Sequence, residues 1–329
     1  MDPRASDPAR AADSRLDAAM ARFAPTAEWR AEPMAEGLTN QVWRVRITGG
    51  PDVVVQVLID ADRAEDIGIV RQLQYTAARI GADLGISPAI LGLYQDLDVV
   101  VSEFVAGGSF PASGPRRLRA ILDVARALRA LHAVPTQAMF FNDITVPMAG
   151  NRLLIERARA ADPAGVAEIE WALAPLERIE ACYQERDLRL VHNDLVETNV
   201  LVGDVTRLID WEYCGLGDPY SDLGDFAGKC ELTVDEEVAF ITAYADEYDE
   251  AAHAWLRVYR YINVLREGMW AIPMLSRGKD GTDYAAYARR RFAQVRSYVS
   301  TSEFSWALSS LEAGRSAPIA PSAPAGVRG

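Results

Sequence analysis

The chain is poor in cysteine, in positive charge and in long apolar runs. Its 329 residues include three cysteines without C-x-x-C spacing, which argues against a disulfide framework or a cysteine zinc site. No apolar run reaches the ~18 residues needed to cross a bilayer, and the charged start of the chain does not resemble a secretory signal. We therefore expect a cytoplasmic globular protein, an enzyme or a binding protein, without a membrane partner.

Lysine and arginine number 34 against 47 aspartates and glutamates, giving a formal net charge of −13. A nucleic-acid binder needs a concentrated basic surface, so nucleic acid is not expected as a partner. The negative charge mildly favours cationic ligands. The oligomeric state is left open by the sequence.

The hydrophobic periodicity changes near residue 107. Before it, alternating or short apolar runs predict four strands, with a helix over 64–84 between the second and the third. The strands are expected at 41–47, 53–58, 89–94 and 97–104. After residue 107, apolar residues three and four apart predict helices. These are expected at 117–132, 166–186, 234–247 and 254–275.

This change predicts an α+β, bilobal chain with a small antiparallel-sheet N-lobe and a larger, mostly helical C-lobe. The expected division is an N-terminal extension over 1–27, an N-lobe over 28–106, a C-lobe over 107–313 and a tail over 314–329. The extension includes a short helix over 13–23. The tail is rich in Pro, Ala, Gly and Ser, a composition typical of disorder.

Residues 190–222 hold the most informative polar side chains. The runs 200–202 and 205–209 flank Gly203-Asp204 and predict a tight hairpin. At ~3.3 Å per residue, the antiparallel return places Asn199 and Asp210 within about 7 Å. Asp194 lies in the loop just before. We expect these three side chains to converge.

Such a set suits phosphoryl transfer, which needs Mg²⁺ on the phosphate oxygens and a carboxylate to orient the attacking hydroxyl. Mg²⁺ prefers oxygen ligands, which Asn199 and Asp210 offer. The carboxylate of Asp194 is suited to accept the proton of an alcohol.

The pattern His192-x-Asp194-x-x-x-x-Asn199 followed by Asp210 resembles the catalytic and metal loops of protein-kinase-like folds. Within that group, residues 33–300 resemble the choline/ethanolamine kinase and aminoglycoside phosphotransferase superfamily. The motifs that carry this resemblance are Gly37-Leu38-Thr39-Asn40, His192-Asn193-Asp194-Leu195, Asp210-Trp211-Glu212-Tyr213 and Gly217-Asp218-Pro219 with Asp222-Leu223.

The resemblance implies ATP and Mg²⁺ as cofactors and assigns roles to the catalytic segment. Asp194 would be the base, and His192 would belong to the catalytic loop in an ordering role. Asn199 and Asp210 would be the metal ligands, with Glu212 as a second-metal or substrate-facing carboxylate.

The resemblance also implies a nucleotide site. Its residues would be Gly37, Leu38, Thr39 and Asn40 over the phosphates, Gln56 on the third strand, and Glu103 and Val105 presenting backbone groups to adenine between the lobes. The family's usual cation stands at the position of Gln56, and its acidic partner near Gln74. The chain thus lacks both charges, although Arg63, Arg71 or the Mg²⁺ ions can compensate.

The acceptor region resembles the aromatic box that surrounds a quaternary ammonium. Trp270, Tyr284 and Tyr287 occupy matching positions, and core packing is their alternative role. Glu267 stands where the family usually has another aromatic residue, and a carboxylate attracts an amine.

The expected function is therefore an ATP-dependent kinase that transfers the γ-phosphate to a cationic small-molecule alcohol such as choline or ethanolamine. The alternatives are a kinase for another alcohol (thiamine, an aminoglycoside, a sugar or an amino acid) and a catalytically weak nucleotide-binding protein.

Overall fold

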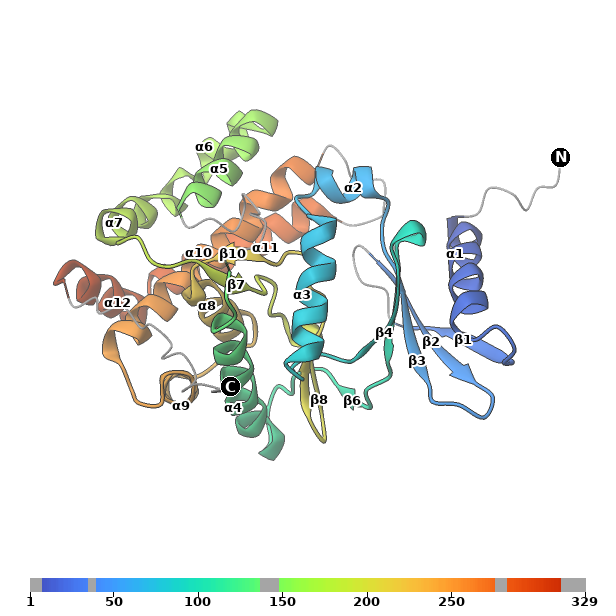
Figure 1. The fold of residues 1–329 in the computed structure, drawn as a ribbon. Coiled ribbons are helices and arrows are strands. Elements are labelled where there is room, and N and C mark those ends of the chain that lie inside the picture. Colours follow the sequence, from blue (N-terminus) through green and yellow to red (C-terminus); the bar gives the residue numbers. More distant parts are fainter. Residues whose placement is uncertain (1–7, 35–39, 137–147, 276–282, 315–329) are drawn as a thin grey trace. The chain divides into compact units, whose positions relative to one another are not determined.

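The computed structural model describes residues 8–34, 40–136, 148–275 and 283–314. The chain forms two compact units, Met1–Gly108 with Gly203–Glu212, and Ser109–Val202 with Tyr213–Gly329. The first contains an antiparallel sheet and the second is mostly helical (Figure 1). The α+β class expected from the periodicity is confirmed.

The first unit contains a five-stranded sheet in the order β1-β2-β3-β5-β4, in which neighbouring strands are antiparallel. Its strands are β1 (Trp29–Pro33), β2 (Gln41–Ile47), β3 (Val53–Val57), β4 (Ile90–Tyr94) and β5 (Val99–Glu103). In the central strand, Val55 lies opposite Trp43 and Val101. Alternate β3 residues are buried, as the alternating pattern predicts.

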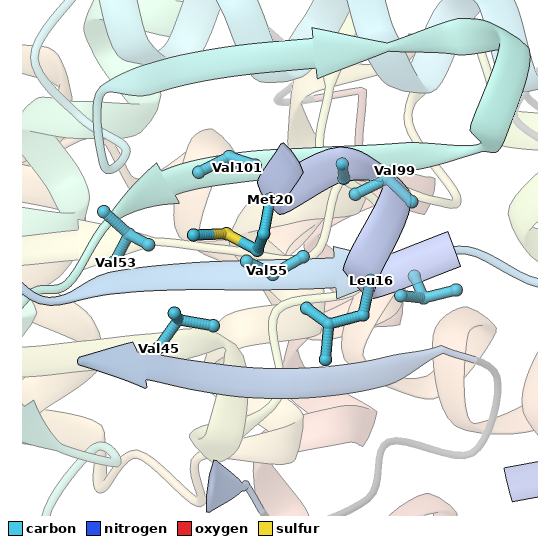
Figure 2. Close-up of a cluster of buried hydrophobic side chains, with 9 residues drawn as sticks. Leu16, Met20, Val45, Val53, Val55, Val99 and Val101 are labelled. Atoms are coloured by element: carbon cyan, nitrogen blue, oxygen red, sulfur yellow. The ribbon is translucent and has the colours of Figure 1, made fainter. Parts of the chain in front are cut away.

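One face of this sheet packs against α1 (Pro8–Phe23). Leu16 and Met20 of α1 lie over the valines of the central strands (Figure 2). The buried valines of this cluster are Val45, Val53, Val55, Val57, Val99 and Val101. Burial of these methyl groups removes apolar surface from water, which holds the N-terminal helix on the sheet.

The helix expected over 64–84 is two helices, α2 (Ala61–Asp66) and α3 (Arg71–Asp83). The chain turns between them at Gly68, whose φ of +86° lies in the left-handed region that favours glycine. The N–H of Ile69 then bonds back to the carbonyl of Ala64 at 2.8 Å. This turn ends the first helix, and the prediction of one continuous helix was wrong.

The second unit is built around α10 (Glu250–Met274), which packs against α5, α8, α11 and α12. Its helices also include α4 (Pro115–His132), α5 (Ala149–Ala161), α6 (Pro163–Glu168), α7 (Ala174–Cys182), α8 (Pro219–Lys229), α9 (Val234–Ala245), α11 (Tyr284–Val299) and α12 (Ser302–Glu312). Two short strands, β7 (Arg189–Val191) and β10 (Gly215–Gly217), pair antiparallel. The helices expected at 117–132, 234–247 and 254–275 are confirmed as α4, α9 and α10.

The helix expected over 166–186 was also wrong. The chain forms α6, a 3-10 turn over Glu170–Ala172 and α7, which ends at Cys182. Pro175 in the first turn of α7 has no N–H to donate, so it starts a helix but cannot continue one. No helix among the described residues is both long and apolar enough to span a bilayer.

Candidate functional site

The motif expected to be catalytic lies between β7 and β8 (Val200–Gly203). Asp194 is in the loop after β7, and Asn199 ends a 3-10 turn over Glu197–Asn199. The two strands expected around Gly203-Asp204 are present as β8 and β9 (Thr206–Leu208). Short strands on either side thus hold the motif in a loop, as the sequence predicts.

Two buried carboxylates of α8 hold this loop. Asp222 accepts the backbone N–H groups of His192 and Asn193 at 2.8 and 2.7 Å. Asp225 accepts the N–H of Leu195 at 2.7 Å. These bonds fix the backbone on both sides of Asp194, and Asn193 takes a left-handed φ of +65° there.

Asp222 also contacts His132. His132 Nε2 lies 3.1 Å from Asp222 Oδ2, and its Nδ1 lies 2.9 Å from the Tyr244 hydroxyl. Both His132 and Asp222 are fully buried. If Nε2 carries the single proton of a neutral ring, it donates to Asp222, and Nδ1 accepts from the Tyr244 hydroxyl.

Asp194 and Asn199 are in direct contact. The Asn199 amide Nδ2 donates to both the backbone carbonyl and Oδ2 of Asp194, each at 2.9 Å. Because both bonds use the nitrogen, the Asn199 Oδ1 is turned away from Asp194, and an oxygen ligand for a hard cation remains there.

Lys229, the last residue of α8, joins Asp194 and Asn199 as a third residue of the site, and it was not predicted from the sequence. Its ammonium lies 2.9 Å from Asp194 Oδ1, 3.2 Å from Asp225 Oδ1 and 2.7 Å from Glu267 Oε1. Burial lowers the pKa of Lys229, but the three carboxylates outweigh it and raise that pKa well above the ordinary value. Burial in turn raises the pKa of Asp225 to about 7, against the opposing effect of Lys229.

A signal for Lys229 was present in the sequence. Only two lysines occur in the chain, Lys229 and Lys279, and Lys229 follows Asp225 by four residues. A lone lysine at this spacing on an apolar helix indicates a buried ion pair.

The rings expected at the acceptor lie together. Trp270 meets Tyr213, Tyr284 and Tyr287 edge to face, with centroid distances of 6.5, 5.9 and 6.5 Å. The guanidinium of Arg291 lies 4.8 Å from the Tyr287 ring centroid. The cluster therefore has the ring geometry of packed aromatics, and one of its faces already meets a cation of the chain.

Glu267 is surrounded by donors from the chain itself. Its Oε2 accepts the Tyr287 hydroxyl at 2.7 Å and pairs with the Arg291 guanidinium. Its Oε1 pairs with Lys229. The carboxylate is only 17% exposed, so its charge is matched locally by two cations.

The remaining predicted residues belong to the first unit. Asp210 has a left-handed φ of +67°, and Trp211 after it is buried, with its Nε1 donating to Ser87 Oγ at 3.0 Å. Buried Glu212 accepts the Asn40 amide at 2.9 Å, and the Asn40 Oδ1 accepts the N–H of Ile59 at 3.1 Å. Gly37, Leu38 and Thr39 fall outside the described residues.

Gln56 and Gln74 stand where charges were expected. Gln56 is half-buried on β3. Buried Gln74 accepts a hydrogen bond from Arg71 at 2.8 Å, and Arg71 also lies 3.3 Å from Asp98. A cation is thus present beside Gln74, held by the chain's own carboxylate.

Glu103 ends β5, and its side chain accepts the N–H of Ala89 at 3.0 Å. The Glu103 backbone N–H also donates to the Ala89 carbonyl at 3.0 Å, and Val105 lies two residues after the strand.

Among the described residues, no three His, Cys, Asp or Glu side chains gather as a metal centre. A magnesium ion does not need such a cage, because substrate phosphates and water complete its coordination.

Comparisons with known proteins agree with the fold. The LicA protein of Haemophilus influenzae strain Rd is 30% identical over 117 residues, 33% of this chain and 43% of that protein. The chain thus aligns with less than half the length of this curated relative.

Three solved structures cover most of the chain. A choline/ethanolamine kinase family protein from Mesorhizobium loti has a TM-score of 0.73 at 23% identity, over 92% of this chain and 99% of the other. Choline kinase LicA from Streptococcus pneumoniae scores 0.65 at 20%, over 87% and 99%. A spectinomycin phosphotransferase in complex with ADP and spectinomycin scores 0.58 at 15%, over 86% and 93%.

The model of the phosphotransferase enzyme family matches residues 30–259, well over half of the sequence. The match includes the loop of Asp194, Asp210 and the first ten residues of α10. The resemblance seen in the sequence motifs is confirmed, and the chain belongs to the phosphotransferase enzyme family.

Proposed function

We propose that the chain is an ATP-dependent kinase that transfers the γ-phosphate to the hydroxyl of a small amino-alcohol such as choline or ethanolamine. Family membership supports phosphoryl transfer, and relatives described as choline or choline/ethanolamine kinases support the acceptor class. The observation that carries the proposal is the position of Asp194. Carboxylates of α8 bind the backbone N–H groups on both sides of it, and the Asn199 amide binds its carboxylate.

In this proposal Asp194 orients the acceptor hydroxyl and takes its proton as the oxygen attacks phosphorus. Each carboxylate oxygen has two lone pairs, so the bonds from Asn199 and Lys229 leave room for a third donor. Phosphoryl transfer needs no further chemistry from the base, because its transition state is loose and catalysis depends mainly on positioning the reactants.

Asn199 and Asp210 are the proposed Mg²⁺ ligands. The donor set fits: both offer oxygen, and the Asn199 amide is held by its nitrogen, as the bonds to Asp194 require. When bound, the ion neutralises charge on the phosphates. The nucleotide is proposed from the family and from the relative that was solved with ADP.

The substitution Asp194→Asn tests the proposal. We expect turnover to fall by about 10²–10⁴-fold, since general-base catalysis is lost, while binding of a fluorescent ATP analogue persists. ADP release is measured with choline, ethanolamine, thiamine, spectinomycin and a sugar as acceptors. Asp187→Asn, whose side chain is 88% exposed, is the matched control. Retained turnover in Asp194→Asn contradicts the assigned role.

A second candidate, a kinase for a neutral alcohol such as a sugar, is favoured by one observation. Both oxygens of Glu267 are paired with groups of the chain, so this carboxylate offers little charge to an amine. Turnover of neutral acceptors with indifference to choline and ethanolamine would select this candidate.

A further inference from the structure

We infer that Lys229 sets the charge selectivity of the acceptor, because its ammonium occupies the carboxylates that a cationic alcohol would otherwise use. The inference rests on the proposed phosphoryl transfer to an alcohol and concerns which alcohols the same site accepts. Lys229 is here a specificity-determining residue.

The position of the ammonium carries the inference. Lys229 Nζ lies 2.9 Å from Asp194 Oδ1 and 2.7 Å from Glu267 Oε1, so it bridges the proposed base and the proposed amine partner. A hydroxyl bound to Asp194 lies within two hydrogen-bond lengths of Nζ, or about 6 Å. In choline and ethanolamine only two carbons separate the hydroxyl from the cation. Their charge must therefore lie in the neighbourhood of Lys229.

The positive and negative charges around Glu267 already balance, so no net negative charge is left to attract a second cation. Lys229 and Arg291 together balance Asp194 and Glu267, and Tyr287 donates to the second oxygen of Glu267. Asp225 completes the cluster at 3.2 Å from Nζ, and burial raises the pKa of Asp225, which disfavours its negative charge.

Arg266 is another partly buried cation close to this cluster. Its NH1 lies 3.3 Å from the Asn193 Oδ1, and its charge interacts with those of Asp225 and Glu267. The groups facing Lys229 from α8, α10, α11 and the catalytic loop therefore sum to little or no negative charge.

A cationic alcohol must either displace Lys229 from these carboxylates or bear its repulsion, while a neutral alcohol does neither. The side chain of Lys229 is 6% exposed and salt-bridged three ways, so displacement is costly. Removing the ammonium should thus change the ratio of cationic to neutral acceptor and not merely the rate.

A matched pair of acceptors measures this ratio. Choline and 3,3-dimethylbutan-1-ol have the same shape and differ in the quaternary nitrogen that the second replaces by carbon. We expect Lys229→Met to raise the choline-to-dimethylbutanol ratio of kcat/KM by about tenfold or more, because like-charge repulsion is removed. Lys229→Arg keeps the charge and should keep the ratio of the parent protein.

A second variant tests the inference without touching Asp194. Arg291 also pairs with Glu267, and its substitution leaves Asp194 and Lys229 in place, so Arg291→Met should raise the same ratio. Arg178→Met, in an exposed pair with Glu312, is the control and should leave the ratio unchanged. If Lys229→Met does not fold, as judged by circular dichroism, Arg291→Met decides the question.

Parallel loss of both activities in Lys229→Met, with an unchanged ratio there and in Arg291→Met, overturns the inference and leaves Lys229 as a structural brace. Failure of the proposed function is distinct: it is the absence of ADP release by the parent protein with every acceptor. In that case, calorimetric dissociation constants for choline and dimethylbutanol supply the ratio. Binding of neither compound to any variant also overturns the inference.

Discussion

Among single residues, Asp222 is important because it holds the loop that contains Asp194. It receives the N–H groups of His192 and Asn193 as well as His132 Nε2. Asn at this position offers one oxygen and turns an NH₂ group toward one of these donors, which leaves a buried N–H unpaired. The loop that presents Asp194 then loses its fixed position.

We therefore expect Asp222→Asn to lower kcat by about 10²-fold, the effect of a small misplacement of a catalytic group. The KM for ATP should change less. Steady-state kinetics and hydrogen exchange of the loop amides check this, with the exposed Asp187→Asn variant as control. Full kcat together with unchanged amide protection would show that Asp222 does not position the loop.

Gln56 and Gln74 raise the question of whether the site is weak or re-tuned. Arg71 donates to Gln74 and also lies 3.3 Å from Asp98, so a carboxylate at position 74 would be captured by Arg71. An ammonium introduced at position 56 would then lack its partner.

For this reason we expect the double variant Gln56→Lys/Gln74→Glu to lose about tenfold in kcat/KM for ATP, a loss typical of one misplaced charged contact. ADP release measured beside the single variants checks it. A large gain would instead indicate a decayed site and favour a nucleotide-binding protein with weak catalysis.

The sequence predicted part of the site at this scale. The spacing of Asp194 and Asn199 indicated their contact, since both lie in one short loop. The contacts of Lys229 and Asp222 join residues about 30 or more positions apart, and such contacts have no local pattern. Only the scarcity of lysine and the i,i+4 spacing to Asp225 hinted at the first of them.

At the scale of elements, α8 and α10 approach closely at a glycine. A Cβ at Gly224 would lie 2.5 Å from the Cβ of Tyr259 and 2.6 Å from the N of Arg260, closer than atoms can pack. Because one of these atoms is backbone, the helices must separate to accept a methyl group.

Gly224→Ala should thus lower the free energy of unfolding by about 1–3 kcal/mol, the usual cost of overpacking. The shift also moves the carboxylates of α8 and so should lower turnover. Urea unfolding checks the first effect. Gly108→Ala, with no atom within 4 Å of its Cβ position, is the control and should retain its stability.

Buried Glu237 joins α9 to α10. Its carboxylate bonds to His253, Arg257 and Arg260 at 2.9, 2.9 and 2.6 Å. Burial raises the pKa of Glu237, but these three partners outweigh burial and hold that pKa below its ordinary value of 4.5. The stabilisation is present above the unfolded-state pKa and is lost as the pH falls through the lowered folded-state pKa.

We expect Glu237→Gln to cost about 3–5 kcal/mol at pH 7, because it leaves buried cations uncompensated. It should also weaken the fall in stability below about pH 4.5. Denaturant unfolding between pH 3 and 7 checks both effects. Glu312→Gln, in an exposed pair, is the control. A variant with parental stability at pH 7 would contradict the expectation.

Elements with strong periodicity were predicted well, and those with weak signals were not. β2, β3, α4 and α10 follow directly from apolar spacing. β1 was missed because it has five residues and contains Pro33, which is tolerated at the sheet edge. Long apolar periodicity also concealed the breaks before α3 and α7, where glycine and proline override it.

At the scale of the whole molecule, the chain leaves the first unit and returns to it. Residues 203–212 belong with 1–108, and local contacts explain why. The N–H of Leu208 bonds to the carbonyl of Ile86, and a Cβ at Gly81 would lie 2.7 Å from the Trp211 ring. A domain boundary predicted from hydrophobic periodicity divides the chain into consecutive segments, so it cannot show that residues 203–212 belong with the first unit.

The net charge of −13 opposes the proposed binding of a nucleotide, which is itself negatively charged. ATP is itself an anion, and Gln56 stands where the resemblance implied a cation. Repulsion between two anions must therefore be offset by a divalent ion, and we expect ATP uptake to depend strongly on Mg²⁺.

This dependence is measured as a thermal shift. A ligand at 100 times its Kd stabilises the folded chain by about 2.7 kcal/mol, which corresponds to roughly 5–10 °C in Tm for a chain of a few hundred residues. Mg²⁺ with ATP should give this shift, whereas ATP with EDTA should give almost none. Asp210→Asn should reduce the shift and Asp187→Asn should not, because only the first removes the negative charge of a proposed ligand. An equal shift with EDTA would mean that the chain binds the nucleotide without the ion, and the proposed roles of Asn199 and Asp210 would be withdrawn.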